Sequence, residues 1–357
     1  MAIQDDLSKA ILDILRAANL NCEIPNELSL ERPKNREHGD FASSIPLALA
    51  KPSGKNPREI AEIIKSGLEA RSDISKVDIA GPGFINISLN SESQGGVVSA
   101  ILAAGKKYGE SKSFPGTKVN LEFISANPTG PLHLGHTRWA AVGDALGRVL
   151  SAAGANVTRE FYINDRGVQM DLFGKSIQAE ALGQTRPEDG YHGEYIADLA
   201  KEVVSKHPEI LQLPQAEQAD AFRDYGYELQ LKEQQDVLVK FGTRFDVWFS
   251  EKSLYENNFF QHCQEVLKSK GHVFELDGAT WLRTTDFGDD KDRVMVKSDG
   301  SMAYFASDSA YYISKRERGF EINIYMLGAD HHGYVGRLKA LAACNNDDPN
   351  YNVEVLI

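Results

Sequence analysis

At the centre of this 357-residue chain stands the sequence Ser125-Ala126-Asn127-Pro128-Thr129-Gly130-Pro131-Leu132-His133-Leu134-Gly135-His136. A mostly apolar run at 119–124 precedes it, as expected of a buried parallel strand. Its X-Pro pairs exclude both strand and helix, because proline lacks a backbone donor and restricts the residue before it. Apolar residues then recur at helical spacing until Gly154, and a second strand is predicted at 157–163. The pattern predicts a βαβ unit whose loop lies where open α/β sheets bind ligands.

The two histidines of this stretch lie at the predicted start of the helix. His133 and His136 are three residues apart, so they share one side of the helix, with its amide dipoles behind them. Gly135 lets a flat ring or a phosphate approach the backbone closely. The alternatives are an incidental pair or half of a metal site, but no nearby Cys or Glu completes a zinc-like set. These residues alone favour a polyanion over a metal.

The whole stretch resembles a known family signature. A Pro-x-His-x-Gly-His sequence directly after a strand resembles the first signature of class I aminoacyl-tRNA synthetases, and the form found here is very similar to that of bacterial arginyl-tRNA synthetases. The resemblance implies an α/β fold: a Rossmann-like parallel sheet with helices on both faces, a connective insertion and a small amino-terminal α/β domain. It also implies that the catalytic residues, which handle ATP, are His133, Gly135 and His136, and that ATP is bound by the same three together with Asn127, Pro128, Thr129 and Gly130.

Composition places the chain among ordinary globular proteins. It is 42% hydrophobic and 25% charged, and no apolar run approaches the length of a membrane span. The amino terminus lacks a basic region followed by an apolar one, so we expect a cytoplasmic protein with no membrane partner. Three widely spaced cysteines offer neither a disulfide framework nor a zinc cluster.

Charge is distributed unevenly along the chain. The net charge of −12 argues at first against a nucleic-acid partner. However, residues 183–278 hold 10 basic and 18 acidic side chains, a local −8, whereas 32–58 hold 6 basic and 2 acidic, a local +4. The basic window near the amino terminus therefore leaves RNA binding open, although such windows are usually solvated faces.

Four segments are predicted. Residues 1–110 form a small α/β domain with amphipathic helices and a hairpin, and two of its motifs resemble the additional amino-terminal domain of arginyl-tRNA synthetases, which implies contact with the tRNA elbow: His-Gly-Asp-Phe at 38–41 and Ala-Gly-Pro-Gly-Phe-Ile-Asn at 80–86. Residues 111–182 are the first half of the catalytic domain. The acidic, largely helical segment 183–278 is a connective insertion, and 279–357 is an incomplete second half.

A second ligand-binding edge is predicted after the strand at 322–327, where the chain reads Gly-Ala-Asp-His-His-Gly at 328–333. A carboxylate after a strand and a glycine suits a ribose diol. Adjacent histidines usually diverge, so a metal is disfavoured. The run 279–340 resembles arginyl-tRNA synthetases strongly, and the resemblance implies that Gly328, Asp330 and His331 help to bind ATP.

A guanidinium group is read bidentately by carboxylates. The resemblance implies that L-arginine is held by Glu122, Ser125, Asn127, Tyr304, Asp308 and His331. Without the family, ordinary ion pairs at Glu122 and Asp308 would be favoured. Ala303–Phe305 is predicted as the strand that returns from the turn at 298–301, with a helix carrying Asp308 after it.

The implied reaction joins L-arginine to tRNA(Arg) through an arginyl-adenylate. Its partners are tRNA(Arg), L-arginine and ATP, with Mg²⁺ accompanying the ATP phosphates and no metal site on the protein. We expect a monomer.

The sequence departs from the full family pattern. A Lys-Met-Ser-Lys-Ser-like loop and an anticodon-binding domain would follow residue 340, so we expect a truncated chain or a natural fragment that binds substrates but is not fully competent. Some relatives also have lysine at Gly130 and glutamine at His331. The alternatives are another HxGH class I synthetase or nucleotidyltransferase, or a non-catalytic tRNA- or nucleotide-binding fragment.

Overall fold

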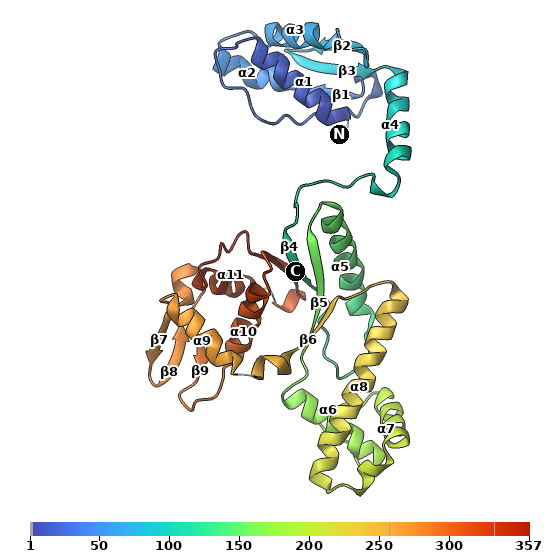
Figure 1. Ribbon diagram of the computed structural model, residues 1–357, viewed down its shortest axis with the longest axis vertical. Coiled ribbons are helices and arrows are strands. Elements are labelled where there is room, and N and C mark those ends of the chain that lie inside the picture. The colour runs from blue at the N-terminus through green and yellow to red at the C-terminus, as the bar shows by residue number, and fades with distance from the viewer. Residues whose placement is uncertain (1–2, 257, 332) are drawn as a thin grey trace. The chain divides into compact units, whose positions relative to one another are not determined.

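The structure, a computed structural model (Figure 1), describes residues 3–256, 258–331 and 333–357. The side chains of Arg36, of residues 91–97 and of Asp330 lie outside this description. The chain divides into two units, Met1–Gly109 and Glu110–Ile357. Each unit has its own core and is described by itself.

The first unit packs helices on one face of a small antiparallel sheet, whose strand order is β1-β3-β2. Its elements are α1 (Ile3–Ala17), η1 (Arg36–His38), β1 (Phe41–Ser43), α2 (Ile45–Ser53), α3 (Pro57–Leu68), β2 (Ile74–Ala80), β3 (Phe84–Leu89), α4 (Ser91–Ala104) and η2 (Gly105–Lys107). Leu7, Ile11 and Leu15 of α1 are fully buried, as their helical spacing predicts. The hairpin predicted around residues 81–83 is the β2–β3 pair.

The second unit is built on a five-stranded sheet of order β11-β10-β4-β5-β6, in which every neighbouring pair is parallel. The strands are β4 (Lys118–Glu122), β5 (Asn156–Ile163), β6 (Val247–Ser250), β10 (Ile322–Met326) and β11 (Val353–Leu356). The chain moves from β4 outward to β5 and β6, and then crosses to β10 on the other side of β4. The order therefore reverses between β4 and β10, and open α/β sheets bind ligands at such a switch point.

Helices cover both faces of this sheet, which confirms the predicted fold class. Val119 and Leu121 of β4 point toward α5 (Leu134–Ala152) and belong to a cluster that includes Trp139, Leu146 and Leu150. Glu122, on the opposite face by strand alternation, contacts Lys315 of α10 (Tyr304–Glu317).

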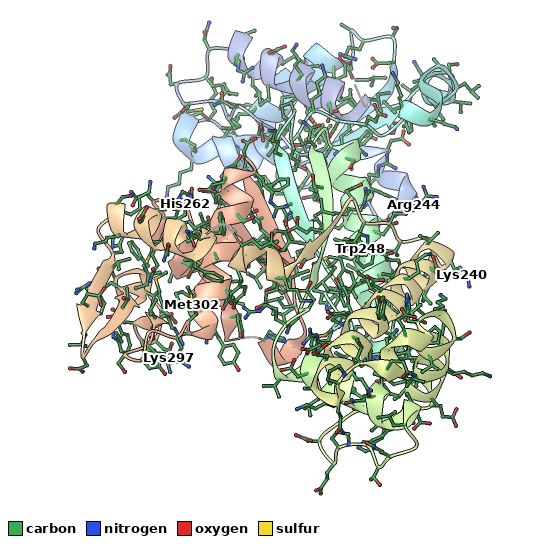
Figure 2. All side chains as sticks on the ribbon, turned by 60° about the horizontal axis from the view of Figure 1, so that its bottom comes forward. Lys240, Arg244, Trp248, His262, Lys297 and Met302 are labelled. Carbon is green, nitrogen blue, oxygen red and sulfur yellow. The ribbon has the colours of Figure 1, made fainter. Side chains whose placement is uncertain are left out.

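The connection from β5 to β6 is a group of helices with its own core (Figure 1). It contains α6 (Val168–Ala181), α7 (Tyr195–Lys206), η3 (Pro208–Gln212) and α8 (Gln215–Phe241). The helix predicted at 229–241 is therefore the second half of a longer one. At the edge of the sheet, Trp248 of β6 stacks on Phe161 with ring centroids 4.5 Å apart, and Figure 2 shows it near the C-terminal end of α8.

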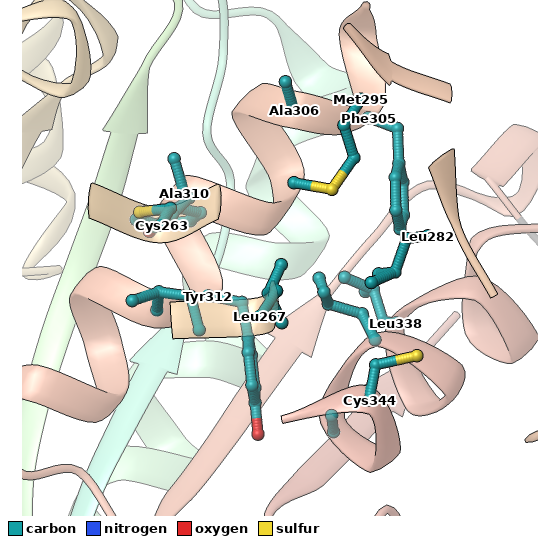
Figure 3. Packing of buried hydrophobic residues seen from close by; sticks show 14 of the residues in the cluster. Cys263, Leu267, Leu282, Met295, Phe305, Ala306, Ala310, Tyr312, Leu338 and Cys344 are labelled. Atoms are coloured by element: carbon teal, nitrogen blue, oxygen red, sulfur yellow. The ribbon is translucent and has the colours of Figure 1, made fainter. Parts of the chain in front are cut away.

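The remaining part of the second unit packs on α10 and completes the sheet. It comprises η4 (Glu251–Tyr255), α9 (Phe259–Ser269), β7 (Val273–Leu276), β8 (Ala279–Leu282), η5 (Thr284–Phe287), β9 (Arg293–Val296), η6 (Ala329–His331) and α11 (Tyr334–Cys344). Its core joins α9, α10 and α11, and Figure 3 shows side chains from all three in contact: Cys263, Leu267, Phe305, Ala310, Leu338 and Cys344.

One predicted element is wrong. Ala303–Phe305 does not return as a strand; only Met302 bridges to Val296, and α10 begins at Tyr304. The physical reason is that Phe305, Ala306, Ser309 and Ala310 are buried at helical spacing, so packing favours a helix over a longer hairpin.

Among the described residues, no helix is long and apolar enough to cross a membrane.

Candidate functional site

The loop after β4 begins with a strained turn. Ile124 and Ser125 have φ angles of 68° and 48°, and the amide of Ser125 donates to the carbonyl of Phe123 at 3.0 Å. This bond closes a three-residue γ-turn, and a positive φ is costly for a β-branched residue such as Ile124. Such strain persists only where the surroundings hold it, and it often accompanies function.

The two histidines cap α5 with their rings. Nδ1 of His133 accepts a hydrogen bond from the amide of Gly135 at 3.1 Å, and Nδ1 of His136 accepts from the amide of His133 at 3.2 Å. The ring centroids are 4.0 Å apart. Because both Nδ1 atoms accept, the neutral rings carry their protons on Nε2, where they are available to donate to a ligand. Burial, aided by the proximity of His133, lowers the pKa of His136.

Two polar side chains of the loop tie it to its neighbours. Oγ of Ser125 accepts from the amide of Tyr162 at 3.2 Å and lies 3.4 Å from Oε1 of Glu122. Nδ2 of Asn127 donates to Oε1 of Gln169, near the start of α6, at 2.8 Å. The loop is therefore anchored to the ends of β4 and β5 and to the helix that follows β5.

A cavity of about 710 Å³ opens at the carboxyl end of the sheet. Its lining includes three carboxylates, and aromatic side chains form much of the rest: Glu122, Glu251, Asp308, Tyr162, Tyr255, Tyr304, Tyr311, Tyr325 and Tyr334. Lys297 and Met302, both labelled in Figure 2, line it from the segment between β9 and α10. Acidic groups in an apolar, concave site suit a cationic ligand with an aliphatic stem.

One face of α10 carries charged and aromatic side chains that line the cavity or pair with the acids of the sheet. Asp308, Tyr311, Lys315 and Arg318 follow at intervals of three or four residues, so they share one side of the helix. Nζ of Lys315 contacts Oε2 of Glu122 at 2.6 Å, and NH2 of Arg318 contacts Oε1 of the fully buried Glu160 at 3.0 Å. Each buried acid of the sheet thus has its own cation.

Asp308 differs from these paired acids. In the part of the chain that the structure describes, no hydrogen bond reaches its carboxylate. Burial raises the pKa of Asp308 to about 7; Arg337 acts against this shift, whereas Glu251 and Glu122 add to it. A half-buried acid with no bonded partner, lining a cavity, is a natural counter-ion for a ligand.

The third carboxylate, Glu251, was not predicted as a site residue. It follows β6 directly, as Glu122 ends β4, and it interacts with the hydroxyls of Tyr162 and Ser307. Burial raises the pKa of Glu251, although those hydroxyls and Arg166 act in the opposite direction. An acid immediately after a predicted parallel strand was the sequence signal that could have identified it.

The remaining predicted residues lie on the α10 and η6 sides. Tyr304 is 96% exposed at the rim of the cavity, and His331 also lines it, with its ring 5.3 Å from that of Tyr334. Gly328 closes the turn into η6 by accepting from the amide of His331 at 2.9 Å. The side chain of Asp330 lies outside the described residues.

The structure thus brings one predicted group together in the cavity: Glu122, Tyr304, Asp308 and His331. The loop residues Ser125, Asn127, Pro128, Thr129, Gly130, His133, Gly135 and His136 are not among its lining residues. The two groups are joined by the Ser125–Glu122 contact and by the bond from Asn127 to Gln169, which does line the cavity. Register also pairs Glu122 with Tyr325, so the two loops leave adjacent strands at one edge.

Among the described residues, no group of three or more His, Cys, Asp or Glu side chains is placed to hold a metal ion. The residues around the cavity therefore suit Mg²⁺ only when the ion arrives with ATP, coordinated by phosphate oxygens and water.

Two family models match the chain. Residues 1–89 match the arginyl tRNA synthetase N-terminal domain, and residues 97–354 match the catalytic domain of the class I (R) tRNA synthetases. The second match covers more than half of the chain.

Relatives with assigned names agree with these models. The chain is 52% identical to an arginine–tRNA ligase of Renibacterium salmoninarum and 51% identical to one of Pseudarthrobacter chlorophenolicus, over 99% of its own length in both cases. It spans 66% and 65% of these relatives, or slightly less than two thirds. The structure of the arginyl-tRNA synthetase of Thermus thermophilus shares the fold, with a TM-score of 0.70 and 21% identity over 99% of this chain and 65% of that one.

Proposed function

The chain belongs to the class I tRNA synthetases of the arginyl (R) type, and from this membership we propose that it binds L-arginine and ATP for the ligation of arginine to tRNA(Arg). The observation that carries the proposal is the Asp308 carboxylate, which lines the cavity without a bonded partner, while the two buried acids of the sheet, Glu122 and Glu160, are each paired with a cation. A guanidinium group supplies the planar, permanently charged partner that such a carboxylate lacks.

The reaction that we propose has two steps. The carboxylate of arginine attacks the α-phosphorus of ATP and expels pyrophosphate, which gives arginyl-adenylate. A terminal hydroxyl of tRNA(Arg) then attacks the arginyl carbonyl and releases AMP. Little covalent chemistry is asked of the protein, so positioning and stabilisation of charge carry the rate.

In the first step His133 and His136 donate through Nε2 to phosphate oxygens. Their Nδ1 atoms are already engaged by backbone amides, which fixes the direction of both rings, and the amino end of α5 adds its favourable dipole. Gly135 and the residues 127–130 give the phosphates and adenine access to the backbone. Mg²⁺ would neutralise the triphosphate without a protein ligand set.

We place the guanidinium in the cavity at Asp308 and Glu122, and the amino and carboxylate groups of the substrate at the edge of the cavity, toward Ser125 and Asn127 of the adjoining loop. Tyr304 and His331 complete the arginine subsite from the rim. Gly328, Asp330 and His331 take the ribose of ATP at the end of β10.

Calorimetry of the chain with L-arginine and with L-citrulline tests the arginine subsite. Citrulline keeps the shape but lacks the charge, so arginine should bind and citrulline should not; Asp308→Ala should lose arginine binding. Equal binding of both ligands, or binding that survives in Asp308→Ala, refutes the guanidinium subsite. Lysine, cysteine and glutamate in the same titration separate this function from that of another HxGH synthetase or nucleotidyltransferase.

We further propose the functional division of the chain. Residues 1–110 contact the tRNA elbow, 111–182 and 279–357 form the catalytic domain, and 183–278 are the insertion. The basic window 32–58 supports the first assignment. Removing the charge of the exposed Lys34 should then make the slope of log K against log salt concentration for tRNA(Arg) binding shallower by about one unit. An unchanged salt slope contradicts a phosphate contact at this residue.

The finer part of the proposal concerns activity. No Lys-Met-Ser-Lys-Ser-like loop occurs within these 357 residues, so we propose that they bind substrates but charge tRNA poorly. Separately, we propose that the chain is a cytoplasmic monomer. Robust aminoacylation by the chain alone contradicts the first of these proposals, and a dimer in sedimentation contradicts the second.

A further inference from the structure

The signature loop is held from outside by two side chains of the segment between β5 and β6. Nε2 of Gln234, on α8, donates to the carbonyl oxygens of Asn127 at 3.0 Å and Gly130 at 2.7 Å. The hydroxyl of Tyr195, on α7, donates to the carbonyl oxygen of Thr129 at 2.8 Å. Three carbonyls within four residues of irregular backbone thus receive their donors from helices more than sixty residues away in sequence.

The donor of two of these hydrogen bonds is a fully buried side chain. Gln234 is 0% exposed, and its Oε1 has no hydrogen-bond partner among the described residues, so the amide group is oriented by its two donor bonds alone. Burial raises the pKa of Tyr195 to about 12, so its hydroxyl keeps the proton that it donates. Thr129 is only 5% exposed, so its carbonyl has little access to water that could replace the donor from Tyr195.

The contacts also restrict the residue at position 130. A side chain at Gly130 would place its Cβ 3.3 Å from the hydroxyl oxygen of Tyr195, which is tighter than ordinary contact. The backbone at 127–130 is therefore contacted from both α7 and α8.

We propose that Gln234 and Tyr195 are positioning residues for the nucleotide: by holding the carbonyls of residues 127–130, they set the loop that presents His133 and His136 to ATP. This inference rests on the proposed function only for the identity of the ligand. It gives the connective insertion, in which the sequence shows no chemistry, an indirect part in ATP binding through the position of the loop.

The test compares three variants of the full chain. Gln234→Met keeps the length of the side chain but removes both donors, and Tyr195→Phe removes one. Gln230→Met is the matched control, because Gln230 is buried one turn earlier on α8 and donates to Glu233 of the same helix. For each variant we measure affinity for a non-hydrolysable ATP analogue and for L-arginine, and amide exchange over 125–136.

We expect Gln234→Met to weaken binding of the ATP analogue on the order of tenfold, as for one or two lost hydrogen bonds, and to weaken arginine binding less, because only Ser125 and Asn127 of the loop are placed at arginine. Tyr195→Phe should cause a smaller loss in the same direction, and both should speed exchange in the loop. Gln230→Met should match the wild type in all three measurements.

Equal nucleotide affinity and equal loop exchange in Gln234→Met and wild type would overturn the inference, as would parallel losses of ATP and arginine binding. If Gln234→Met does not fold, Tyr195→Phe decides on the same criteria. A wild type that binds no nucleotide contradicts the proposed function instead, and loop exchange then still tests the positioning role.

Discussion

Nζ of Lys315 lies 2.6 Å from Oε2 of Glu122, and the two side chains are 0% and 8% exposed. Strand register places Glu122 directly beside Glu160 on β5, and Arg318 pairs with that second acid. Two buried carboxylates side by side would repel each other without a cation for each. The cations on this face of α10 therefore neutralise the two carboxylates of the sheet, whereas Asp308, on the same face, remains available to a ligand.

Replacing the cation of the first pair should be costly. Lys315→Met leaves Glu122 buried without its partner, so we expect a loss of about 3 to 5 kcal/mol in the free energy of unfolding, measured in urea. The double variant Glu122→Gln/Lys315→Met should recover most of that loss. Lys232→Met, which breaks only an exposed helical pair with Asp236, should change stability by no more than about 0.5 kcal/mol. Similar stabilities for the two lysine variants would show that the buried pair contributes nothing.

Arginine binding should depend on pH through Asp308. With its pKa raised to about 7, chiefly by burial, this carboxyl is largely protonated below that pH and must lose a proton to pair with a guanidinium. Affinity should therefore rise with pH through about 7 and level off above it. Calorimetry in buffers of different ionisation enthalpy should show proton release on binding near pH 6. A flat profile from pH 5.5 to 8.5 contradicts the role of Asp308.

The same residue should lower stability at high pH. The folded-state pKa of Asp308 lies above the ordinary value of 3.8, so the folded chain holds this proton where the unfolded chain has lost it. Its contribution to stability is fully present below about pH 4 and is lost as pH rises through about 7. Asp308→Asn should thus be more stable than the wild type at pH 8 by about 2 to 4 kcal/mol, and equally stable near pH 4. Thermal unfolding at both values measures this, and a destabilised variant at pH 8 would count against it.

Periodicity and turn chemistry were enough to predict most strands of the sheet, whereas most of the site residues were named from the family resemblance. The run at 119–124, the prolines and the helical spacing up to Gly154 predicted the β4–loop–α5 unit, and Gly154 has the expected positive φ of 97°. The resemblance named Glu122 and Asp308 as arginine-binding residues, whereas the residues alone favoured ordinary ion pairs at both positions, and the helix carrying Asp308 was predicted to follow a strand at Ala303–Phe305.

Long-range partners could not be predicted in this way. Lys315 is one of two basic residues in the last turn of α10, and only the packing of this helix on the sheet places it against Glu122, 193 residues earlier. Gln234 has no local signal at all, because its partners are backbone carbonyls of a distant loop. The helix start at Tyr304 was mispredicted because a turn followed by Tyr304 and Phe305, both of good strand propensity, resembles a hairpin, whereas burial over the following turns favours a helix.

The two roles of His133, as a cap and as a ligand for phosphate, can be separated. Asparagine is a good N-cap, so His133→Asn should keep stability within about 0.5 kcal/mol while weakening binding of an ATP analogue. His133→Ala loses both roles and should also cost about 1 kcal/mol in stability. Urea unfolding and nucleotide titration on the two variants distinguish these effects. Wild-type nucleotide affinity in His133→Asn would remove the imidazole from the proposed phosphate site.

The close packing of α5 against the end of β4 should leave no room for a side chain at Gly143. A Cβ at Gly143 would overlap the ring of Phe123, which directly precedes the strained turn at Ile124. Gly143→Ala should therefore lose about 1 to 3 kcal/mol, although alanine is the better helix former, and should weaken nucleotide binding by moving the start of the loop. Gly336→Ala is the matched control, because its Cβ would meet no atom within 4 Å on α11, so the gain in helix propensity should stabilise it by about 0.5 to 1 kcal/mol. Opposite signs for the two glycine substitutions in urea unfolding are the expected result. If Gly143→Ala is also stabilising, Phe123 can move freely, and the rigid support inferred for the loop does not exist.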